Sequence, residues 1–436
     1  MAEMRPFKGY RYTLAKPEDL GNLIAPPYDM LDEEKIEALY RKDPLNAVRI
    51  DQNRRESSDT ATIDRHRRAG ALFDEWVGRG ALRLDGLPSL YIYEQQFTIE
   101  RAGAIERCER TGVVALVKLV DFEEDVVLPH EQTLSGPKTD RYEHLAATRL
   151  NVGQIFGLLA DRDGGIFKLI RSMKKGQPLG TAIDGDGVQH SLYSCSDAAL
   201  IDRFVSASQP STILIADGHH RYETALEYCR DQGNDPVAAQ VMMTLVSTAD
   251  PGLTIRAFHR LIRKGFGDAS VNLRRDLARY FTLVDAGKAD SAAVNAFLGG
   301  RIDAEMLYVD STDGRAYGCS LNADGENHLQ TTLPGQSLLW KNLDMSRINV
   351  IVINRIFNLP LDGKVLHDAV DYRHDAGAAL SAALDPTGFH GGFFLRPVSL
   401  DTIFRITRGG ERMPQKSTNF YPKLYSGLVF HHLGDA

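Results

Sequence analysis

The stretch at residues 211–230, STILIADGHHRYETALEYCR, constrains the fold more than any other part of the chain. It opens with an apolar run that contains the β-branched residues Ile213 and Ile215, a pattern typical of a buried strand. After Asp217 and Gly218 the apolar residues recur at the spacing of a helix. We therefore predict a strand, a sharp turn and a helix, with the strand inside a mixed sheet.

The turn of this unit, residues 217–221 (the DGHHR box), combines the groups that an anion site needs. Gly218 lets the backbone turn sharply, and the first turn of the following helix offers N–H groups and the positive end of the helix dipole to a phosphate. Arg221 adds a forked cation, while His219 and His220 can donate hydrogen bonds. Asp217 has the wrong charge for phosphate, so it implies a bridging cation or a substrate hydroxyl or ammonium group.

Each residue of the DGHHR box also has an ordinary structural interpretation. Asp217 could cap the helix, Arg221 could pair with an acid, and a histidine could be a satisfied, half-buried group. Several polar groups at one strand-to-helix turn nevertheless favour a binding site, because α/β proteins bind ligands at the carboxyl ends of their strands.

Two further polar stretches are candidates for the same site. PHEQ at residues 129–132 places Glu131 on a loop, although a surface glutamate is usually only solvated. PQKST near the C-terminus places Lys416, Ser417 and Thr418 between two prolines that disfavour regular structure, which leaves side chains and N–H groups free to bind an anion. The alternative for this second stretch is a polar turn that caps a helix.

The length of 436 residues allows two or three compact units, because single cores seldom grow past roughly 250 residues. Helical and strand patterns alternate along the chain: a helix is predicted over 61–79, and strands over 89–99 and 110–122. The predicted fold class is α+β, a mixed α/β protein. The predicted units are an N-terminal α/β unit at 1–125, a phosphate-binding core at 126–264, and a C-terminal α/β unit at 265–436 that completes the site.

Composition argues against several classes of function. A net charge of -7 disfavours a protein that grips nucleic acid, and no basic stripe offsets it. The four cysteines form no C-x-x-C pair, which is typical of a reducing cytoplasm rather than a disulfide or cysteine zinc site. The sequence shows neither a signal peptide nor an apolar run of roughly 20 residues. We expect a cytoplasmic protein that binds small molecules, with nucleic acid and membranes excluded as partners and a homo-oligomer left open.

Four motifs carry a resemblance that extends over nearly the whole chain: IAPPYD, HEQTLSGPKTDR, IADGHHRYETA and MPQKSTNFYPKL. In these the chain resembles a widespread family of uncharacterised bacterial and archaeal proteins. That family is similar in turn to the ParB/sulfiredoxin-like free serine kinases, which convert L-serine to O-phospho-L-serine with a nucleotide donor. Those kinases carry a Pro-His-Glu-Gln stretch, an Asp-Gly-His-His-Arg box and a late Pro-Lys-Thr-Thr stretch in the same order.

The resemblance implies a ParB/sulfiredoxin-like core around the DGHHR box and a small-molecule kinase that uses Mg²⁺ with ATP or ADP. Its substrates would be a nucleotide and a small hydroxy amino acid, free L-serine above all, and PHEQ, DGHHR and PQKST would converge on one cleft. The implied roles are general base for Glu131, serine-binding or base-assisting carboxylate for Asp217, nucleotide and phosphate binding for Gly218, His219, His220 and Arg221, and substrate or product binding for His130, Lys416, Ser417 and Thr418. No resident metal site is expected.

Other functions remain open on sequence grounds. A metal-dependent hydrolase could use His130, Asp217, His219, His220 and His259, although adjacent histidines on one turn seldom face one ion. A non-catalytic nucleotide sensor would share the site but lack turnover. A DNA clamp is disfavoured by the acidic charge balance and the lack of a clear helix-turn-helix. A sulfiredoxin-like reductase would need a cysteine in the DGHHR box.

Overall fold

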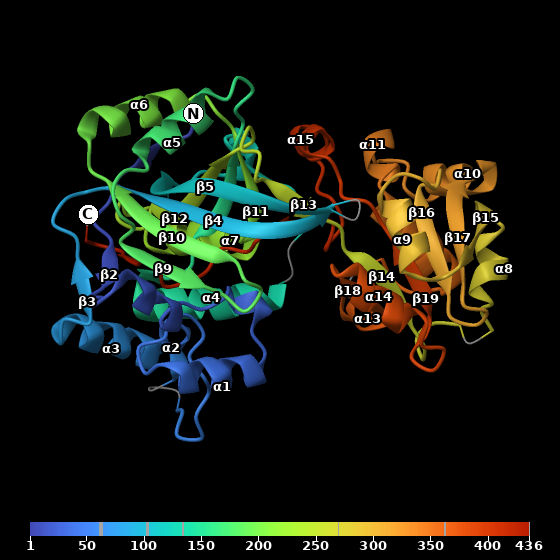
Figure 1. The fold of residues 1–436 in the computed structure, drawn as a ribbon, viewed down its shortest axis with the longest axis horizontal. Helices are drawn as coiled ribbons and strands as arrows, with labels where there is room; N and C mark the ends of the chain where they lie inside the picture. The colour runs from blue at the N-terminus through green and yellow to red at the C-terminus, as the bar shows by residue number, and fades with distance from the viewer. Residues whose placement is uncertain (61–63, 102–103, 133–134, 269, 362, 436) are drawn as a thin grey trace.

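The computed structural model contains two large sheets with helices packed around each, which confirms the predicted mixed α/β class (Figure 1). It describes residues 1–60, 64–101, 104–132, 135–268, 270–361 and 363–435. The larger sheet lies in the first 250 residues, and the smaller one lies in the C-terminal unit. Part of the predicted helix at 61–79 falls outside the described residues, and the rest forms α3 (Arg65–Gly78).

The nine-stranded sheet is mixed. Its order is β6-β11-β8-β12-β5-β4-β10-β9, and a short strand, β1, pairs with β5. Two neighbouring pairs are parallel, β6 with β11 and β8 with β12, whereas the remaining pairs are antiparallel. The strands are β1 (Met4–Arg5), β4 (Leu90–Arg101), β5 (Ala104–Lys118), β6 (Val127–Pro129), β8 (Ile155–Leu159), β9 (Gly180–Ile183), β10 (Gln189–Cys195), β11 (Ile213–Asp217) and β12 (Gln240–Ser247).

Strand β11 is buried on both faces, as its apolar run predicts. Ile213 and Ile215 point into a core formed with helices α5, α6 and α7, and Leu214 points into the core on the opposite face. That opposite core includes the N-terminal segments and the end of the chain. The helices of this unit are α1 (Glu33–Lys42), α2 (Val48–Asp51), α3, α4 (Ser135–Thr148), α5 (Gly165–Met173), α6 (Ala198–Ser208) and α7 (His219–Asp231).

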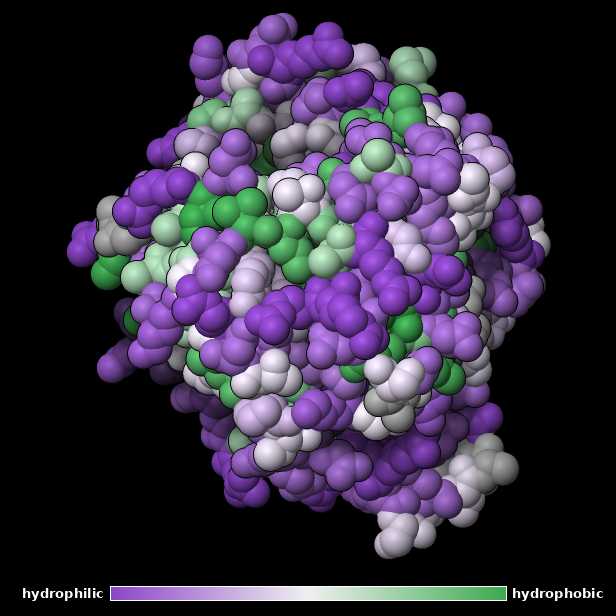
Figure 2. Space-filling model, turned by 90° about the vertical axis from the view of Figure 1, so that its right-hand side faces the viewer, coloured by the Kyte–Doolittle hydropathy of each residue, from purple (hydrophilic) through white to green (hydrophobic). Residues whose placement is uncertain are grey.

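The six-stranded sheet of the C-terminal unit is antiparallel, with the order β15-β17-β16-β19-β14-β18. Its strands are β14 (His259–Arg263), β15 (Phe281–Lys288), β16 (Met306–Asp310), β17 (Arg315–Leu321), β18 (Val370–Arg373) and β19 (Phe389–Phe394). Its helices are α8 (Leu273–Leu277), α9 (Ser291–Leu298), α10 (Ala323–Thr332), α11 (Leu338–Lys341), α12 (Asp344–Arg347), the π-helix η4 (Ile348–Ile356), α13 (Gly363–Ala369), α14 (Ala376–Ala383) and α15 (Leu400–Arg408). Polar side chains dominate the face that Figure 2 shows, with apolar ones in small groups.

After the C-terminal unit the chain returns to the nine-stranded unit and ends there (Figure 1). This returning segment makes two small two-stranded sheets, β13 (Thr254–Arg256) with β20 (Asn419–Tyr421), and β7 (Leu150–Asn151) with β21 (His431–His432). A third small sheet joins β2 (Tyr10–Tyr12) to β3 (Leu82–Leu84). The C-terminal segment therefore forms part of the nine-stranded unit even though it is distant in sequence.

The predicted boundary at residue 125 falls within one sheet, because β4 and β5 precede it while β6, β8, β11 and β12 follow it. The sheet thus combines the first two predicted units, and the three-unit division itself stays a prediction. Among the described residues, no helix is long and apolar enough to span a membrane.

Arg110 anchors the returning segment to the nine-stranded sheet. Its guanidinium, which is 1% exposed, donates hydrogen bonds to the carbonyls of Tyr421, at 2.9 Å, and Pro422, and also to the side chain of Gln95. The guanidinium carbon lies 4.6 Å from the ring centroid of Phe156. Burial lowers the pKa of Arg110 to about 10, so it stays charged at neutral pH.

Arg110→Met should lower the free energy of unfolding by about 2–4 kcal/mol, because it leaves buried carbonyls without their donor. Urea denaturation of this variant and of Arg83→Met, which alters an exposed arginine on β3, measures the effect. Arg83→Met should stay within about 0.5 kcal/mol of wild type. Equal losses in the two variants would show that Arg110 does not anchor the segment.

Candidate active site

The candidate site lies where two neighbouring parallel strands end. In the pairing of β6 with β11, Leu128 faces Leu214 and Pro129 faces Ile215. Because parallel strands end at the same edge of a sheet, Glu131, which follows β6, and Asp217, which ends β11, line the same pocket. PHEQ and the DGHHR box therefore come together in space although they are far apart in the sequence.

Gly218 provides the turn that the sequence predicts. It has φ of 90°, which favours glycine, and helix α7 begins at the next residue. A Cβ atom at Gly218 would lie 3.0 Å from Nε and Nη2 of Arg221, so the missing side chain also makes room for that guanidinium. The sequence predicts that Gly218 helps to bind phosphate, but its backbone N–H is already used within the protein. It donates a hydrogen bond to Oδ1 of Asp217 at 2.7 Å.

Arg221 folds back from α7 over the turn. Its Nη1 donates to the carbonyl of Gln154 at 2.8 Å, and its guanidinium carbon lies 5.9 Å from the ring centroid of Tyr28. Its Nε is buried and has no hydrogen-bond partner within the described ranges. Arg221 is thus held in place at one end, while part of its donor set remains available to a ligand.

His130 supports the site from behind. It is fully buried, with Nδ1 2.6 Å from the carbonyl of Ile215 and Nε2 2.7 Å from Oγ1 of Thr418. Its backbone N–H donates to Nε2 of His219 at 3.3 Å. Burial lowers the pKa of His219 to about 3, with the nearby His130 adding to the effect, so His219 is neutral at pH 7. Since Nε2 of His219 accepts, its proton lies on Nδ1, which makes that atom a neutral donor.

The carboxylate of Glu131 holds the PQKST stretch against the PHEQ loop. Oε1 accepts the backbone N–H groups of Ser417 at 3.1 Å and Thr418 at 2.9 Å. Burial raises the pKa of Glu131, but the interaction with His130 and the backbone N–H of Thr418 outweigh burial and bring the pKa to about 2. Glu131 is therefore ionised at neutral pH. We call these two backbone hydrogen bonds the Glu131 clamp.

The PQKST stretch is held from its other side by the C-terminal unit. Arg260 on β14, which is fully buried, donates from Nη2 to the carbonyls of Gln415 at 3.4 Å and Lys416 at 3.2 Å. Lys416 has φ of 56°, a conformation that non-glycine residues adopt only where the surroundings impose it. Its exposed side chain extends over Phe258, with Nζ 5.6 Å from the ring centroid.

Lys423 and Asp29 complete the site, and sequence reasoning missed both. Nζ of Lys423 lies 2.8 Å from Oδ2 of Asp217. Burial lowers the pKa of Lys423, but the carboxylates of Asp217 and Asp29 outweigh it, so the pKa is raised. The pKa of Asp217 is lowered by Lys423 and Arg221, against the effect of burial. Burial and the neighbouring Asp217 raise the pKa of Asp29, although its side chain reaches the surface at the rim.

These residues surround a pocket with a volume of about 230 Å³, a size suited to a small ligand. Eight of the sequence-predicted residues line it: Glu131, Asp217, Gly218, His219, His220, Arg221, Lys416 and Thr418. Two predicted residues lie behind it. His130 is engaged as described above, and the hydroxyl of Ser417 donates to the carbonyl of Pro414. The predicted convergence of PHEQ, DGHHR and PQKST on one cavity is thus present in the structure.

The signals for the missed residues were weak in the sequence. Lys423 and the pair Tyr28 and Asp29 belong to the quoted motifs MPQKSTNFYPKL and IAPPYD, so their presence in motifs was the only available signal. A lysine after a proline and an aspartate in a short loop have no spacing that points to a shared site.

The fold and site define a mixed α/β protein with a charged pocket at the carboxyl ends of adjacent parallel strands. The chain belongs to the family described as Protein of unknown function (DUF1015), whose family model matches residues 4–346. Comparison with curated protein sequences gives no match.

Three solved structures show weak similarity to this chain. A free serine kinase in complex with AMP has 12% identity and a TM-score of 0.35, covering 71% of this chain and 90% of that chain. SbnI with a C-terminal truncation from Staphylococcus aureus has 12% identity and a TM-score of 0.35, covering 71% and 84%. A conserved hypothetical protein from Pyrococcus furiosus has 13% identity and a TM-score of 0.33, covering 72% and 94%. At these TM-scores the likeness assigns no activity to this chain.

The Glu131 clamp should make stability depend on pH. A carboxylate whose pKa falls from 4.5 to about 2 on folding stabilises the folded state above pH 4.5, and this contribution is lost as the pH falls towards 2. The stability difference between wild type and Glu131→Gln should therefore shrink by about 1–2 kcal/mol between pH 6 and pH 3.5. Urea denaturation at both pH values measures it, and a difference independent of pH would contradict the clamp.

Proposed function

We propose that this protein is a nucleotide-dependent phosphotransferase that phosphorylates the hydroxyl group of a small amino acid, most readily free L-serine, with ATP or ADP as donor. The observation that carries the proposal is one pocket lined by the carboxylate of Glu131, the N-terminus of α7 and three cations, Arg221, Lys416 and Lys423. Phosphoryl transfer needs a positioned hydroxyl acceptor and charge stabilisation around the phosphate, and little covalent chemistry from the protein.

The phosphate groups of the donor would bind between α7 and the PQKST stretch. Arg221 and the first turn of α7 line the pocket together with Lys416 and Lys423. Arginine and the N–H groups of a helix start both recognise phosphate oxygens, and the Nδ1–H of His219 adds a neutral donor. These groups would stabilise the charge on the transferred phosphoryl group and on the leaving nucleotide.

Glu131 would bind the hydroxyl of the acceptor. Its Oε1 is occupied by the clamp, so the second carboxylate oxygen is the one that would accept the hydroxyl proton. In the reaction the serine oxygen forms a bond to the terminal phosphorus, the bond from that phosphorus to the bridging oxygen breaks, and the hydroxyl proton passes to Glu131. A pKa of about 2 makes this carboxylate a weak base, so its main contribution is to orient the hydroxyl group.

The donor set of the pocket also fits a Mg²⁺ ion bound with the nucleotide. Mg²⁺ prefers one or two carboxylates together with phosphate oxygens, and Asp29 and Asp217 are two interacting carboxylates in this pocket. These two residues would hold the ion. When bound, Mg²⁺ would neutralise phosphate charge, while Lys423 orients the carboxylate of Asp217.

The proposal includes a ParB/sulfiredoxin-like core at residues 126–264, centred on β11, the DGHHR box and α7. The predicted unit at 265–436 would complete the site by supplying Lys416 and Lys423, which lie in the segment that returns to the nine-stranded unit. Support comes from the order of the three motifs along the chain and from their convergence on one pocket.

A metal-dependent hydrolase has less support from the geometry. Both ring nitrogens of His130 are engaged by Ile215 and Thr418, and His259 lines a different cavity. Within the described ranges, no group of three or more His, Cys, Asp or Glu residues is arranged to hold a metal ion. A nucleotide sensor would use the same pocket as the kinase, and turnover distinguishes the two functions.

Incubation of the purified protein with Mg²⁺, either ATP or ADP, and a panel of free hydroxy amino acids tests the activity. Mass spectrometry should detect a phosphorylated amino acid, with serine giving the most product. If the protein binds nucleotide but forms no phosphorylated product, the kinase assignment is wrong and the protein is a nucleotide sensor.

Two substitutions should separate chemistry from binding. Glu131→Gln keeps an acceptor oxygen for the clamp but turns an NH2 group towards the acceptor hydroxyl. That group can neither orient the hydroxyl as an acceptor nor take its proton, so turnover should fall on the order of 100 to 10,000-fold while nucleotide affinity stays near wild type. Arg221→Ala should weaken nucleotide binding and turnover together, because its charge acts before and during the reaction. Kinetics and calorimetric titration measure both effects.

Glu33→Gln, an exposed change on α1, is the matched control and should leave both quantities unchanged. Full activity of the Glu131→Gln variant would show that Glu131 has no role in the reaction.

A further inference from the structure

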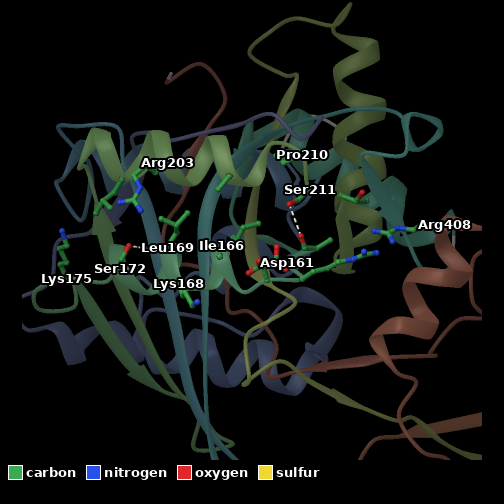
Figure 3. A pocket seen from close by; sticks show the side chains of 17 residues that line it. Asp161, Ile166, Lys168, Leu169, Ser172, Lys175, Arg203, Pro210, Ser211 and Arg408 are labelled. Carbon is green, nitrogen blue, oxygen red and sulfur yellow. Dashed lines mark hydrogen bonds between the residues drawn. The ribbon is translucent and has the colours of Figure 1, made fainter.

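A second cavity, larger than the candidate pocket, opens on the nine-stranded unit between α5 and α6 (Figure 3). It has a volume of about 870 Å³, within the range of ligand sites. Its walls come from the loop after β8, the helices α5 and α6, the loop before β11 and the C-terminal end of α15. We call it the α5–α6 groove.

The α5–α6 groove is lined by an excess of positive charge in a chain whose net charge is -7. Arg408 reaches the groove from α15 at one end, while Lys175 and Arg203 lie towards the other end (Figure 3). Lys175 is 4.0 Å from Asp197. Across the described part of the chain, no carboxylate lies within ion-pair distance of the other four cations, which are Arg162, Lys168, Arg203 and Arg408.

The acidic residues of the α5–α6 groove offset little of this charge. Asp161 is buried and turned inward, where its Oδ2 accepts the N–H of Phe167 at 2.9 Å and the hydroxyl of Ser247 at 2.7 Å. Only Asp163 among the lining acids is exposed. Five cations therefore face two carboxylates, one of which is already satisfied by the protein.

Apolar side chains lie among the cations. Ile166 and Leu169 of α5 line the α5–α6 groove together with Leu200 of α6, and Pro210 lies beside them. Ser211 holds the loop before β11 in place by donating to the carbonyl of Ala160 at 3.2 Å (Figure 3). The lining thus combines separated positive charges with an apolar wall, which suits a ligand that has both anionic and apolar parts.

The α5–α6 groove is separate from the candidate pocket. Thr212 lies next to the start of β11 and lines the groove, whereas Asp217 ends the same strand and lines the pocket. Five strand residues rise roughly 3.3 Å each, so the two cavities lie at opposite ends of β11, about 16 Å apart along the strand.

We propose that the α5–α6 groove is a second binding site, for an organic polyanion of the nucleoside polyphosphate class. The phosphates would contact the four cations that lack carboxylate partners, and the base or sugar would pack on the apolar wall. A duplex nucleic acid fits less well, because the cations come from separate elements around a concave space and do not form a stripe. This proposal is independent of the reaction at the candidate pocket.

The test uses calorimetric titration of the full chain carrying Arg221→Ala, which weakens the candidate pocket and leaves the groove intact. ATP should still bind to this protein at one site, with an affinity that falls between 50 and 300 mM salt. When Lys168→Glu and Arg203→Glu are added to the Arg221→Ala protein, ATP binding should weaken at least tenfold.

The control adds Lys288→Glu and Arg301→Glu to the Arg221→Ala protein instead. These residues are exposed on the C-terminal unit and give the same change in charge, so the affinity for ATP should stay unchanged.

Three results would overturn the proposal. The first is the absence of saturable ATP binding in the Arg221→Ala protein, and the second is an equal loss of affinity in both charge-reversed proteins, which would reflect the overall field. The third is tighter groove-dependent binding of duplex DNA or of inorganic tripolyphosphate than of ATP. Circular dichroism confirms that each variant is folded, which is expected because all four substituted side chains are exposed.

Discussion

The acceptance of two backbone N–H groups by the Glu131 carboxylate is the interaction on which the candidate site depends. Because Ser417 and Thr418 lie 286 and 287 residues away in sequence, this contact joins the nine-stranded unit to the segment that follows the C-terminal unit. A buried carboxylate is costly unless hydrogen bonds and positive charge stabilise it, and here the stabilising groups are the elements of the site. The charge of Glu131 and the shape of the pocket are therefore coupled.

The C-terminal unit contributes by restraining the same stretch from its other side. Arg260 binds the carbonyls of Gln415 and Lys416, while Glu131 binds the following N–H groups. Held at both edges, the chain adopts a left-handed conformation at Lys416 and presents that lysine to the pocket. Lys423 then pairs with Asp217, so one C-terminal segment supplies two cations to a site whose carboxylates come from elsewhere.

The local parts of the site could be predicted from sequence, because their signals lie within about twenty residues. The apolar run before Asp217, the glycine and the helical spacing predict β11, the turn and α7 at nearly their observed bounds. The ion pair of Asp217 with Lys423 could not be predicted, because it joins two segments that are distant in sequence, which no local pattern encodes.

A crystal structure of the protein with Mg²⁺, ADP and L-serine would show whether donor and acceptor meet in this pocket. We expect the terminal phosphate to contact Arg221 at the start of α7 together with Lys416 and Lys423, and the serine hydroxyl to lie within hydrogen-bond distance of the second carboxylate oxygen of Glu131. A nucleotide bound elsewhere, with this pocket empty, or a serine whose hydroxyl points away from Glu131 would contradict the account.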